Sequence, residues 1–276
     1  MKKYMIPLCA GMYAAAMTAC ATGLPGNDGG KAASGPVVAE SDDSEPASFT
    51  RDGDYIIFGH YEQDGDESNG PEPIEWEVLE ESDGRMLLIS RYILETKPYN
   101  IENEDVTWET CSIRQWLNDD FYYDAFNADE QAGIVKMKLS NPNNKCWGTR
   151  GGKATEDHVF FLSAEEIHEY FNFNTWDDDS KLGHSQELMA GYTQQALSNG
   201  LKIYNVTQDQ YDTELAGYGY DKSCIGQSYG VWWLRSTGYI SCRACLVYEY
   251  GYAGWGYETL VSFDNRGVRP AIYIKL

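Results

Sequence analysis

The apolar residues of this chain fall into short strand-like runs, and only brief stretches between the runs have helical spacing. Residues 74–79 alternate apolar with polar positions, as a half-buried strand does, and residues 86–90 form an apolar run typical of a central strand. Residues 55–59 and 134–139 are also predicted strands. Such a pattern favours an α+β fold over regular βαβ winding, with small mixed or antiparallel sheets, a few short helices and long loops.

Three stretches have helical character. Ser112 is placed to cap a helix that continues with helical spacing through residues 121–126. Ser163 and Glu166 form a capping box after the apolar run 159–162, and this helix is expected to reach Phe171. Residues 188–197 are predicted as a third helix. The polar, Tyr/Gly-rich residues 198–229 are interpreted as an inserted loop, and strand fragments without helical period follow from Val231 to the end.

The N-terminus has the pattern of an export signal. Met1, Lys2 and Lys3 precede the uncharged, mostly apolar or small residues 4–19, which are too few to span a membrane. Residues 17–20, Met-Thr-Ala-Cys, resemble a bacterial lipobox, in which the chain is cut before the cysteine and the cysteine is acylated. We therefore predict a signal peptide over 1–19 and a lipid anchor on Cys20. An ordinary signal cut after Ala21 is the alternative.

A tether and a single domain are expected after the signal. Residues 20–50 are rich in Gly, Ala, Ser, Pro and acidic residues and lack periodicity, which predicts a flexible acidic linker. About 30 residues of this kind span roughly 30 Å on average. Residues 51–276 are then the folded domain, exported, anchored to the bacterial cell envelope through the lipid and exposed at the surface.

Charge excludes several classes of partner. Asp and Glu number 43 against 21 Lys and Arg, so the formal net charge is -22. Nucleic acid is excluded as a partner, because phosphate contacts need clustered basic residues. Docking on anionic headgroups is also disfavoured, so the lipid is the expected membrane contact. Aromatic residues make up 14% of the chain, which an acidic disordered protein would not contain.

Three segments carry a family resemblance, and they occur in the family's order over about residues 51–276. They are residues 74–79 with 87–90, then residues 107–109 with 112–118, 121–122 and 125–126, and finally residues 232–236 with Gly238 and 267–271. Together they resemble a large bacterial domain family of unknown function that is common in secreted and lipid-anchored proteins. The resemblance implies the C-type-lectin-like fold that is shared with formylglycine-generating enzymes.

The C-terminal segment resembles the variable region of proteins diversified by retroelements. Such regions alternate scaffold residues with diversified surface residues, and residues 238–267 have this arrangement. Tyrosine gives a large amphipathic contact area with few rotamers to immobilise, which suits a binding face. A half-buried sheet without a ligand is the alternative. The predicted ligand-binding residues are Tyr239, Ser241, Tyr248, Tyr250, Tyr252, Trp255, Tyr257, Phe263, Asp264 and Arg266.

Recognition of an extracellular protein or carbohydrate is therefore the predicted function, and two alternatives remain. Cys242 and Cys245 lie where formylglycine-generating enzymes carry copper-binding cysteines, but the spacing differs from that family's pattern. A structural envelope lipoprotein without a specific ligand is the other alternative. If the chain is exported, one or two disulfides can form among Cys111, Cys146, Cys224, Cys242 and Cys245, an odd number that leaves at least one thiol over.

No catalytic residue, resident metal or cofactor is predicted. His60, His158, His168 and His184 are scattered, and no metalloprotease, nucleophile-elbow or phosphate-loop motif is present. Calcium is an alternative at residues 64–75, where Asp64, Asp66, Ser68 and Glu75 have the spacing of a calcium loop without its glycine. Arg235 and Arg269 are expected to be structural ion-pair partners.

Overall fold

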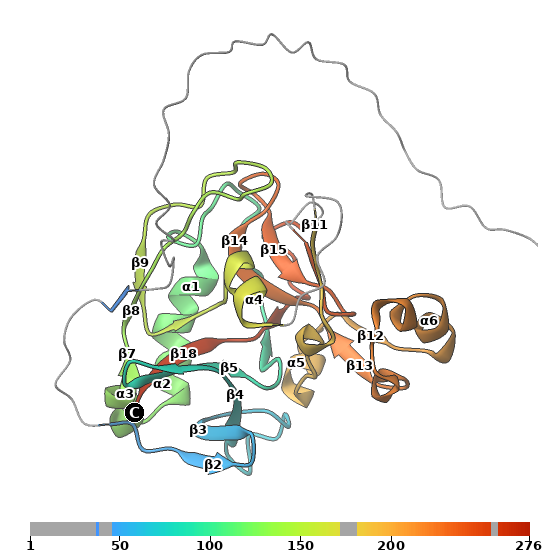
Figure 1. Ribbon diagram of the computed structural model, residues 1–276. Coiled ribbons are helices and arrows are strands. Elements are labelled where there is room, and N and C mark those ends of the chain that lie inside the picture. The colour runs from blue at the N-terminus through green and yellow to red at the C-terminus, as the bar shows by residue number, and fades with distance from the viewer. Residues whose placement is uncertain (1–36, 39–45, 172–180, 255–258) are drawn as a thin grey trace, which may run out of the picture. The chain divides into compact units, whose positions relative to one another are not determined.

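The structure is a computed structural model, and it describes residues 37–38, 46–171, 181–254 and 259–276 (Figure 1). The signal peptide predicted over 1–19, Cys20, Trp255 and Tyr257 lie outside the described residues. Short helices accompany several small sheets, so the prediction of an α+β fold is confirmed. In the described part of the chain, no helix is both long and apolar enough to cross a membrane.

The larger sheet contains the strands that apolar alternation predicted. Its described strands are β2 (Thr50–Asp52), β3 (Tyr55–Tyr61), β4 (Glu72–Ser82), β5 (Arg85–Ser90), β7 (Ile134–Val135), β10 (Val159–Phe160) and β18 (Ala271–Lys275). They run in the order β10-β18-β5-β4-β3-β2, with β7 also paired to β18. β5 lies between β18 and β4 and is buried from Met86 to Ser90, which confirms it as a central strand.

A second, mixed sheet holds the C-terminal segment. Its described strands are β6 (Glu95–Thr96), β11 (Lys181–His184), β14 (Trp232–Thr237), β15 (Ala244–Val247), β16 (Tyr252–Gly254) and β17 (Gly267–Val268). The order is β11-β16-β15-β14-β17-β6, and β14 pairs with β17 in parallel. Trp232 and Trp233 are fully buried on β14, and their indole N–H groups donate to the carbonyls of Leu188 and Lys97. Both rings thus pack in the core without leaving an unsatisfied donor.

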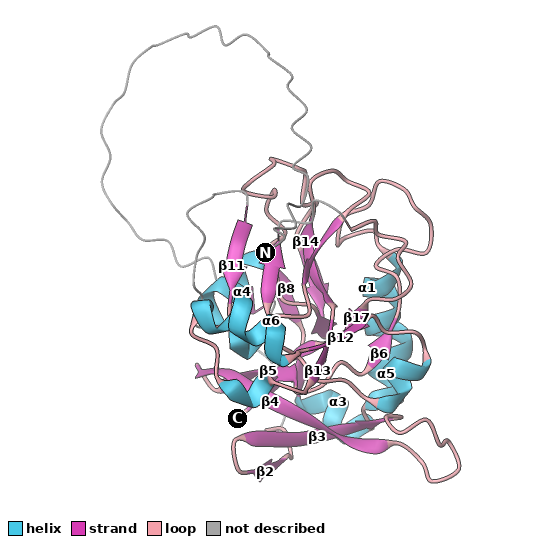
Figure 2. Cartoon of the chain, turned by 90° about the vertical axis from the view of Figure 1, so that its right-hand side faces the viewer, coloured by secondary structure: helices cyan, strands magenta, loops and turns pink. Residues whose placement is uncertain are grey.

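The helices are short and lie beside the sheets. The described ones are α1 (Ser112–Trp116), a π-helical turn η1 (Leu117–Phe121), α2 (Tyr122–Ala125), α3 (Ala128–Gly133), α4 (Ala164–Tyr170), α5 (Gln194–Ser198) and α6 (Gln208–Thr213). There are also 3-10 turns at η2 (Gln186–Leu188), η3 (Leu215–Tyr218) and η4 (Lys222–Cys224). α4 contacts β14 and α5 contacts β6, and in Figure 2 these two helices lie on opposite sides of the strands.

Two helix predictions need correction. The N-cap of α1 is Cys111 rather than Ser112, whose hydroxyl oxygen instead accepts a hydrogen bond from the Ile101 N–H. The helix predicted over 188–197 is wrong, because Ala190 and Tyr192 make β-bridges that leave only η2 and the short α5. By contrast, the capping box of Ser163 and Glu166 is present at α4 as predicted.

The inserted loop predicted over 198–229 is a small substructure, which we call the insertion. It consists of β12 (Ile203–Asn205), α6, η3, η4 and β13 (Ser228–Gly230), with β12 and β13 paired. Its own buried cluster contains Val206, Tyr211, Leu215, Tyr220 and Cys224. The sequence concealed this structure because only a few apolar residues, widely spaced among polar ones, form the cluster. Figure 1 shows the insertion projecting beside β15 and α5.

Parts of the predicted linker belong to the fold. β1 (Val37–Val38) pairs with β8 (Met137–Leu139), which in turn pairs with β9 (Thr155–Asp157). The predicted strand at 134–139 is thus two strands, β7 and β8, in different sheets. Ala47 is buried and donates its N–H to the carbonyl of Lys275. The described fold therefore begins upstream of residue 51.

Two buried arginines, Arg235 and Arg269, form ion pairs within the domain. The guanidinium of Arg235 on β14 binds both carboxylate oxygens of Glu166 on α4, and its Nη1 also donates to the carbonyl of Phe161. Arg269, 1% exposed, binds Glu77 through Nη2 and donates from Nε to the carbonyl of Ser90. Both arginines are therefore structural, as predicted.

Candidate functional site

Three of the predicted tyrosines line one pocket. β15 and β16 form a hairpin, residues 244–254, whose turn carries Tyr248 and Tyr250 and whose second strand begins at Tyr252. The Tyr248 N–H donates to the Tyr252 carbonyl at 2.7 Å, which closes the turn. The pocket has a volume of about 240 Å³, and we call it the tyrosine pocket. Its described lining consists of His184, Glu214, Leu215, Tyr218, Tyr248, Glu249, Tyr250 and Tyr252.

The insertion supplies the opposite wall of the tyrosine pocket. Tyr220 donates its hydroxyl hydrogen to the carbonyl of Tyr250 at 2.8 Å, and the amide of Gln210 on α6 donates to the hydroxyl of Tyr250. The Tyr204 ring meets the Tyr250 ring edge-on, with centroids 6.4 Å apart. These contacts join the insertion to the hairpin, so the shape of the pocket depends on two segments that are distant in sequence.

His184 forms the base of this arrangement. It lies on β11, opposite Tyr252 of β16, and is 7% exposed. Its ring centroid is 4.1 Å from that of Tyr218 and 5.7 Å from that of Tyr220. Burial lowers the pKa of His184, which favours the neutral imidazole. It therefore acts as a further aromatic wall rather than as a cation.

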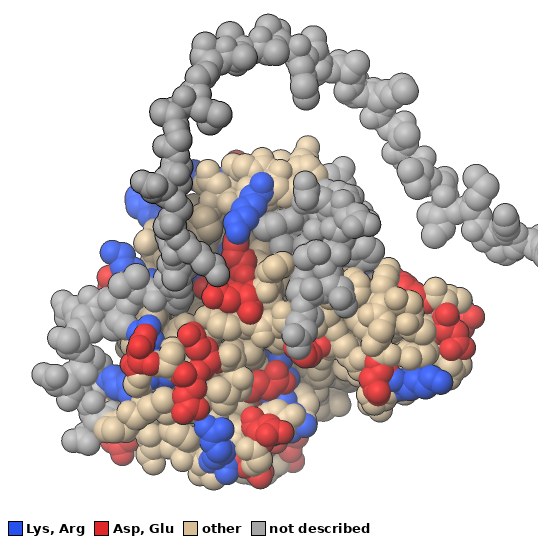
Figure 3. All heavy atoms as spheres, in the orientation of Figure 1, with Lys and Arg blue, Asp and Glu red and all other residues tan. Residues whose placement is uncertain are grey.

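The charge of the tyrosine pocket is negative. Glu214 lies exposed at its margin and Glu249 is partly buried, and none of the described lining residues is Lys or Arg. Burial raises the pKa of Glu249, and the charge of Glu214 acts in the same direction, whereas Lys202 and Arg266 oppose the rise. Figure 3 shows acidic side chains over the insertion, where Asp209, Asp212, Glu214 and Asp221 are exposed.

Tyr239 and Ser241 lie at the other end of β15. They precede Ala244, whereas the tyrosine pocket follows Val247, and a strand of four residues is about 13 Å long. Tyr239 is 41% exposed and meets the Trp147 ring edge-on at 4.8 Å. Ser241 lines a second hollow of about 260 Å³ together with Glu109 and Arg150. The predicted binding face is thus divided between two ends of one strand.

The last predicted site residues lie in the loop before β17. Asp264 is exposed and Phe263 is partly buried against the core. Arg266 is 7% exposed, and its guanidinium lies 5.2 Å from the Phe263 ring centroid and binds the Asn265 side chain. Arg266 therefore stabilises its own loop, and the structure does not place it on an exposed binding surface.

Of the two cysteines compared with a copper site, Cys245 lies in an environment that disfavours a thiolate. Cys111, Cys224, Cys242 and Cys245 are free thiols. Cys245 is fully buried, its thiol faces the carbonyl of Thr237 at 3.3 Å, and burial raises its pKa well above the ordinary value. A metal-binding or nucleophilic cysteine needs a thiolate, which this environment disfavours. The observations therefore give the oxidase alternative no support.

The calcium ligands expected at residues 64–75 do not converge. Glu75 forms an ion pair with Arg91, and Asp66 accepts hydrogen bonds from the backbone and hydroxyl of Ser68. Asp64 accepts from the Asn69 amide at 2.9 Å. The spacing of these four residues was misleading, because the acidic side chains stabilise the turn itself. Carboxylate oxygens of Glu62, Asp64 and Glu72 do lie within 4.8 Å of one another, but the Glu62 and Glu72 carboxylates accept hydrogen bonds from the loop backbone.

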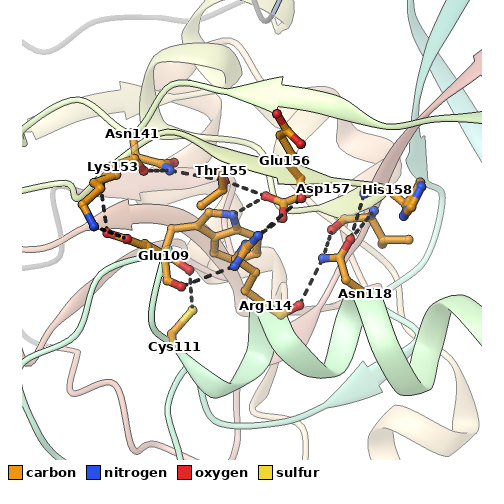
Figure 4. A network of polar contacts seen from close by, with 12 residues as sticks. Glu109, Cys111, Arg114, Asn118, Asn141, Lys153, Thr155, Glu156, Asp157 and His158 are labelled. Carbon is orange, nitrogen blue, oxygen red and sulfur yellow. Dashed lines mark hydrogen bonds and ion pairs between the residues drawn. The ribbon is translucent and has the colours of Figure 1, made fainter. Parts of the chain in front are cut away.

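A second polar cluster, which sequence reasoning missed, is structural (Figure 4). The carboxylate of Asp157 is fully buried and binds the Arg114 Nε at 2.6 Å, the Trp108 indole N–H at 2.9 Å and the Thr155 hydroxyl at 2.8 Å. Asn118 beside it bridges α1 and the start of β10. These contacts join β9 to α1 and satisfy both Asp157 oxygens, as expected of a structural carboxylate.

Sequence comparison identifies one family. No curated protein and no solved structure matches the chain significantly. The profile of the family described as domain of unknown function DUF6273 matches residues 83–276, and this span includes the tyrosine pocket, the insertion and both buried arginines. The chain therefore belongs to the DUF6273 domain family.

Proposed function

We propose that this protein is a lipid-anchored binding protein that is displayed on the bacterial cell envelope. Its tyrosine pocket would bind an extracellular protein or carbohydrate through a domain of C-type-lectin-like fold. The observation that carries the proposal is the convergence of Tyr248, Tyr250 and Tyr252 with Tyr218 on one pocket. Aromatic side chains of this kind dominate the energetics of recognition surfaces.

The hairpin separates scaffold from display positions, which supports the retroelement-like pattern. Ala244, Val247 and Ala253 are fully buried in β15 and β16. Tyr248, Tyr250 and Tyr252 are partly exposed and line the pocket between them. This alternation of buried and partly exposed positions is the property that a diversified binding protein needs. A neighbouring reverse transcriptase gene with a near-copy of this segment that differs at adenines would test the diversification.

Lipidation of Cys20 is the first testable part. Metabolic labelling with palmitate is expected to label the wild-type protein and to leave a Cys20→Ser variant unlabelled, because only the cysteine thiol and its new amine accept the acyl chains. Fractionation of the same cells would place the wild type with the membrane. A wild-type protein that carries no label and begins after Ala21 would contradict the anchor.

Ligand binding is the second testable part. Tyr248→Ser and Tyr252→Ser are expected to weaken binding by about tenfold or more, because each removes a large aromatic contact from the pocket. Binding of wild type and variants to arrays of glycans and of extracellular proteins would measure this. Tyr123→Ser is the matched control, since Tyr123 is 66% exposed on α2 and does not line the pocket.

The outcome also separates binding from packing. Weakened binding with an unchanged melting temperature supports the proposal. A wild-type protein that binds nothing on either array, combined with tyrosine variants that only lose stability, would identify a structural envelope lipoprotein instead.

A further inference from the structure

We propose that the tyrosine pocket binds an alkylammonium group of its ligand. This inference rests on the proposed function and names the chemistry that the site recognises. Lysine side chains, their methylated forms and choline-type groups share this chemistry.

Aromatic rings surround the pocket from several directions. Tyr248 and Tyr252 lie with ring centroids 5.2 Å apart and planes inclined by 48°, so they form a corner rather than a stack. Tyr218 stands against His184 on the other wall, with planes inclined by 36°. Tyrosine faces carry negative quadrupole potential and attract cations placed over them. Inclined rings around a small volume are the arrangement by which proteins bind quaternary ammonium and methyl-lysine groups.

Carboxylates complete the wall. Glu249 follows Tyr248 in the hairpin, Glu214 comes from the insertion, and both line the pocket. Each carboxylate would attract a cation in the pocket. An anionic ligand would meet the same two charges and be repelled.

The two basic side chains near Glu249 do not line the tyrosine pocket. Lys202 and Arg266 are the basic groups near Glu249. The ammonium of Lys202 lies 4.9 Å from the centroid of the Tyr204 ring, and the guanidinium of Arg266 lies over Phe263. Neither residue is among the described residues that line the pocket. The exposed Asp209, Asp212 and Asp221 of the insertion add negative potential that would attract a cationic ligand from solution.

Titration of the full chain with small probes tests this inference. Choline and tetramethylammonium are expected to bind, whereas 3,3-dimethylbutan-1-ol, the neutral isostere of choline, is expected to bind about tenfold more weakly or not at all. Line broadening of the probe in NMR spectra would report binding. A trimethyl-lysine peptide, an unmodified lysine peptide and phosphocholine, compared in the same assay, would distinguish a protein source of the group from a headgroup source.

A variant that removes the charge of one carboxylate tests whether binding depends on the positive charge of the ligand. Glu249→Gln keeps the shape of the side chain and is expected to weaken choline binding by about fivefold to tenfold. Glu102→Gln is the matched control, because Glu102 is an exposed carboxylate of the same residue type outside the described pocket lining, and it should leave binding unchanged. Equal affinity for choline and its neutral isostere, or no effect of Glu249→Gln, would overturn the inference.

Failure of this inference and failure of the proposed function give different results. If an array ligand binds through Tyr248 and Tyr252 but is not displaced by choline, tetramethylammonium or the trimethyl-lysine peptide, the binding function stands and the cation inference is wrong. If neither the array ligands nor the probes bind, both are wrong.

Discussion

Replacing Arg235 by Met is expected to lower the free energy of unfolding by about 3–5 kcal/mol, because it leaves the carboxylate of Glu166 buried without its partner. Arg235 and Glu166 have side chains that are 4% and 11% exposed, and the guanidinium binds both carboxylate oxygens. Glu166 also accepts the Ser163 N–H at 2.9 Å, so the pair fixes the start of α4 against β14. Urea unfolding followed by tryptophan fluorescence would measure the loss.

A surface pair provides the control for this prediction. Arg51 and Glu81 lie 3.5 Å apart with side chains 48% and 55% exposed, so Arg51→Met should cost less than about 1 kcal/mol. The double variant Arg235→Met, Glu166→Leu should recover part of the stability, because no buried charge is left unpaired. Equal losses for Arg235→Met and Arg51→Met would show that the buried pair does not have the expected role.

Gly251→Ala is expected to destroy the tyrosine pocket. Gly251 has φ +67°, and a Cβ atom there would lie 1.9 Å from the backbone oxygen of Ser185. Because the Ser185 N–H donates to the Gly251 carbonyl at 2.9 Å, the two backbones cannot separate without breaking the contact that brings β11 and His184 to the hairpin. We expect loss of ligand binding and a loss of stability of about 2 kcal/mol or more.

Gly148→Ala is the control for Gly251→Ala, because it introduces the strain of a left-handed backbone without a steric clash. Gly148 has φ +71°, but a Cβ atom there would meet nothing within 4 Å. Its substitution should cost about 1 kcal/mol and leave binding intact. Thermal unfolding and the binding assay, run on both variants, would test the difference, and similar behaviour of the two would contradict the proposed role of the close contact at Gly251.

The sequence predicted strands and helix caps correctly where a short local pattern determines them. The run at residues 86–90 became the central strand β5, since a strand buried on both faces needs apolar residues at consecutive positions. Ser163 and Glu166 formed their capping box, because its hydrogen bonds involve only residues three positions apart. The helix predicted over residues 188–197 was wrong. Leu188, Ala190 and Ala196 are buried, but they belong to η2, to a β-bridge and to the short α5 rather than to one helix.

The sequence predicted only part of the candidate site, because the site also depends on residues that are distant in sequence. The local density of tyrosine pointed to Tyr248, Tyr250 and Tyr252, which do share a pocket. His184, Glu214 and Tyr218 were missed, although residues 218–220 repeat the Tyr-Gly composition of the C-terminal segment. Arg266 was interpreted as a display residue because residues 238–267 resemble a variable region, but its guanidinium is buried over Phe263.

By itself, the sequence determined the acidic charge, the α+β class and the aromatic character of the C-terminal segment. These properties depend on composition and on patterns within a few residues. Only the tertiary structure decided which tyrosines face a common ligand volume. The pairing of His184 with Tyr252 and the bond from Tyr220 to Tyr250 bring together residues 68 and 30 positions apart. Such contacts depend on strand order and register in the mixed sheet, which long-range packing sets and no local pattern encodes.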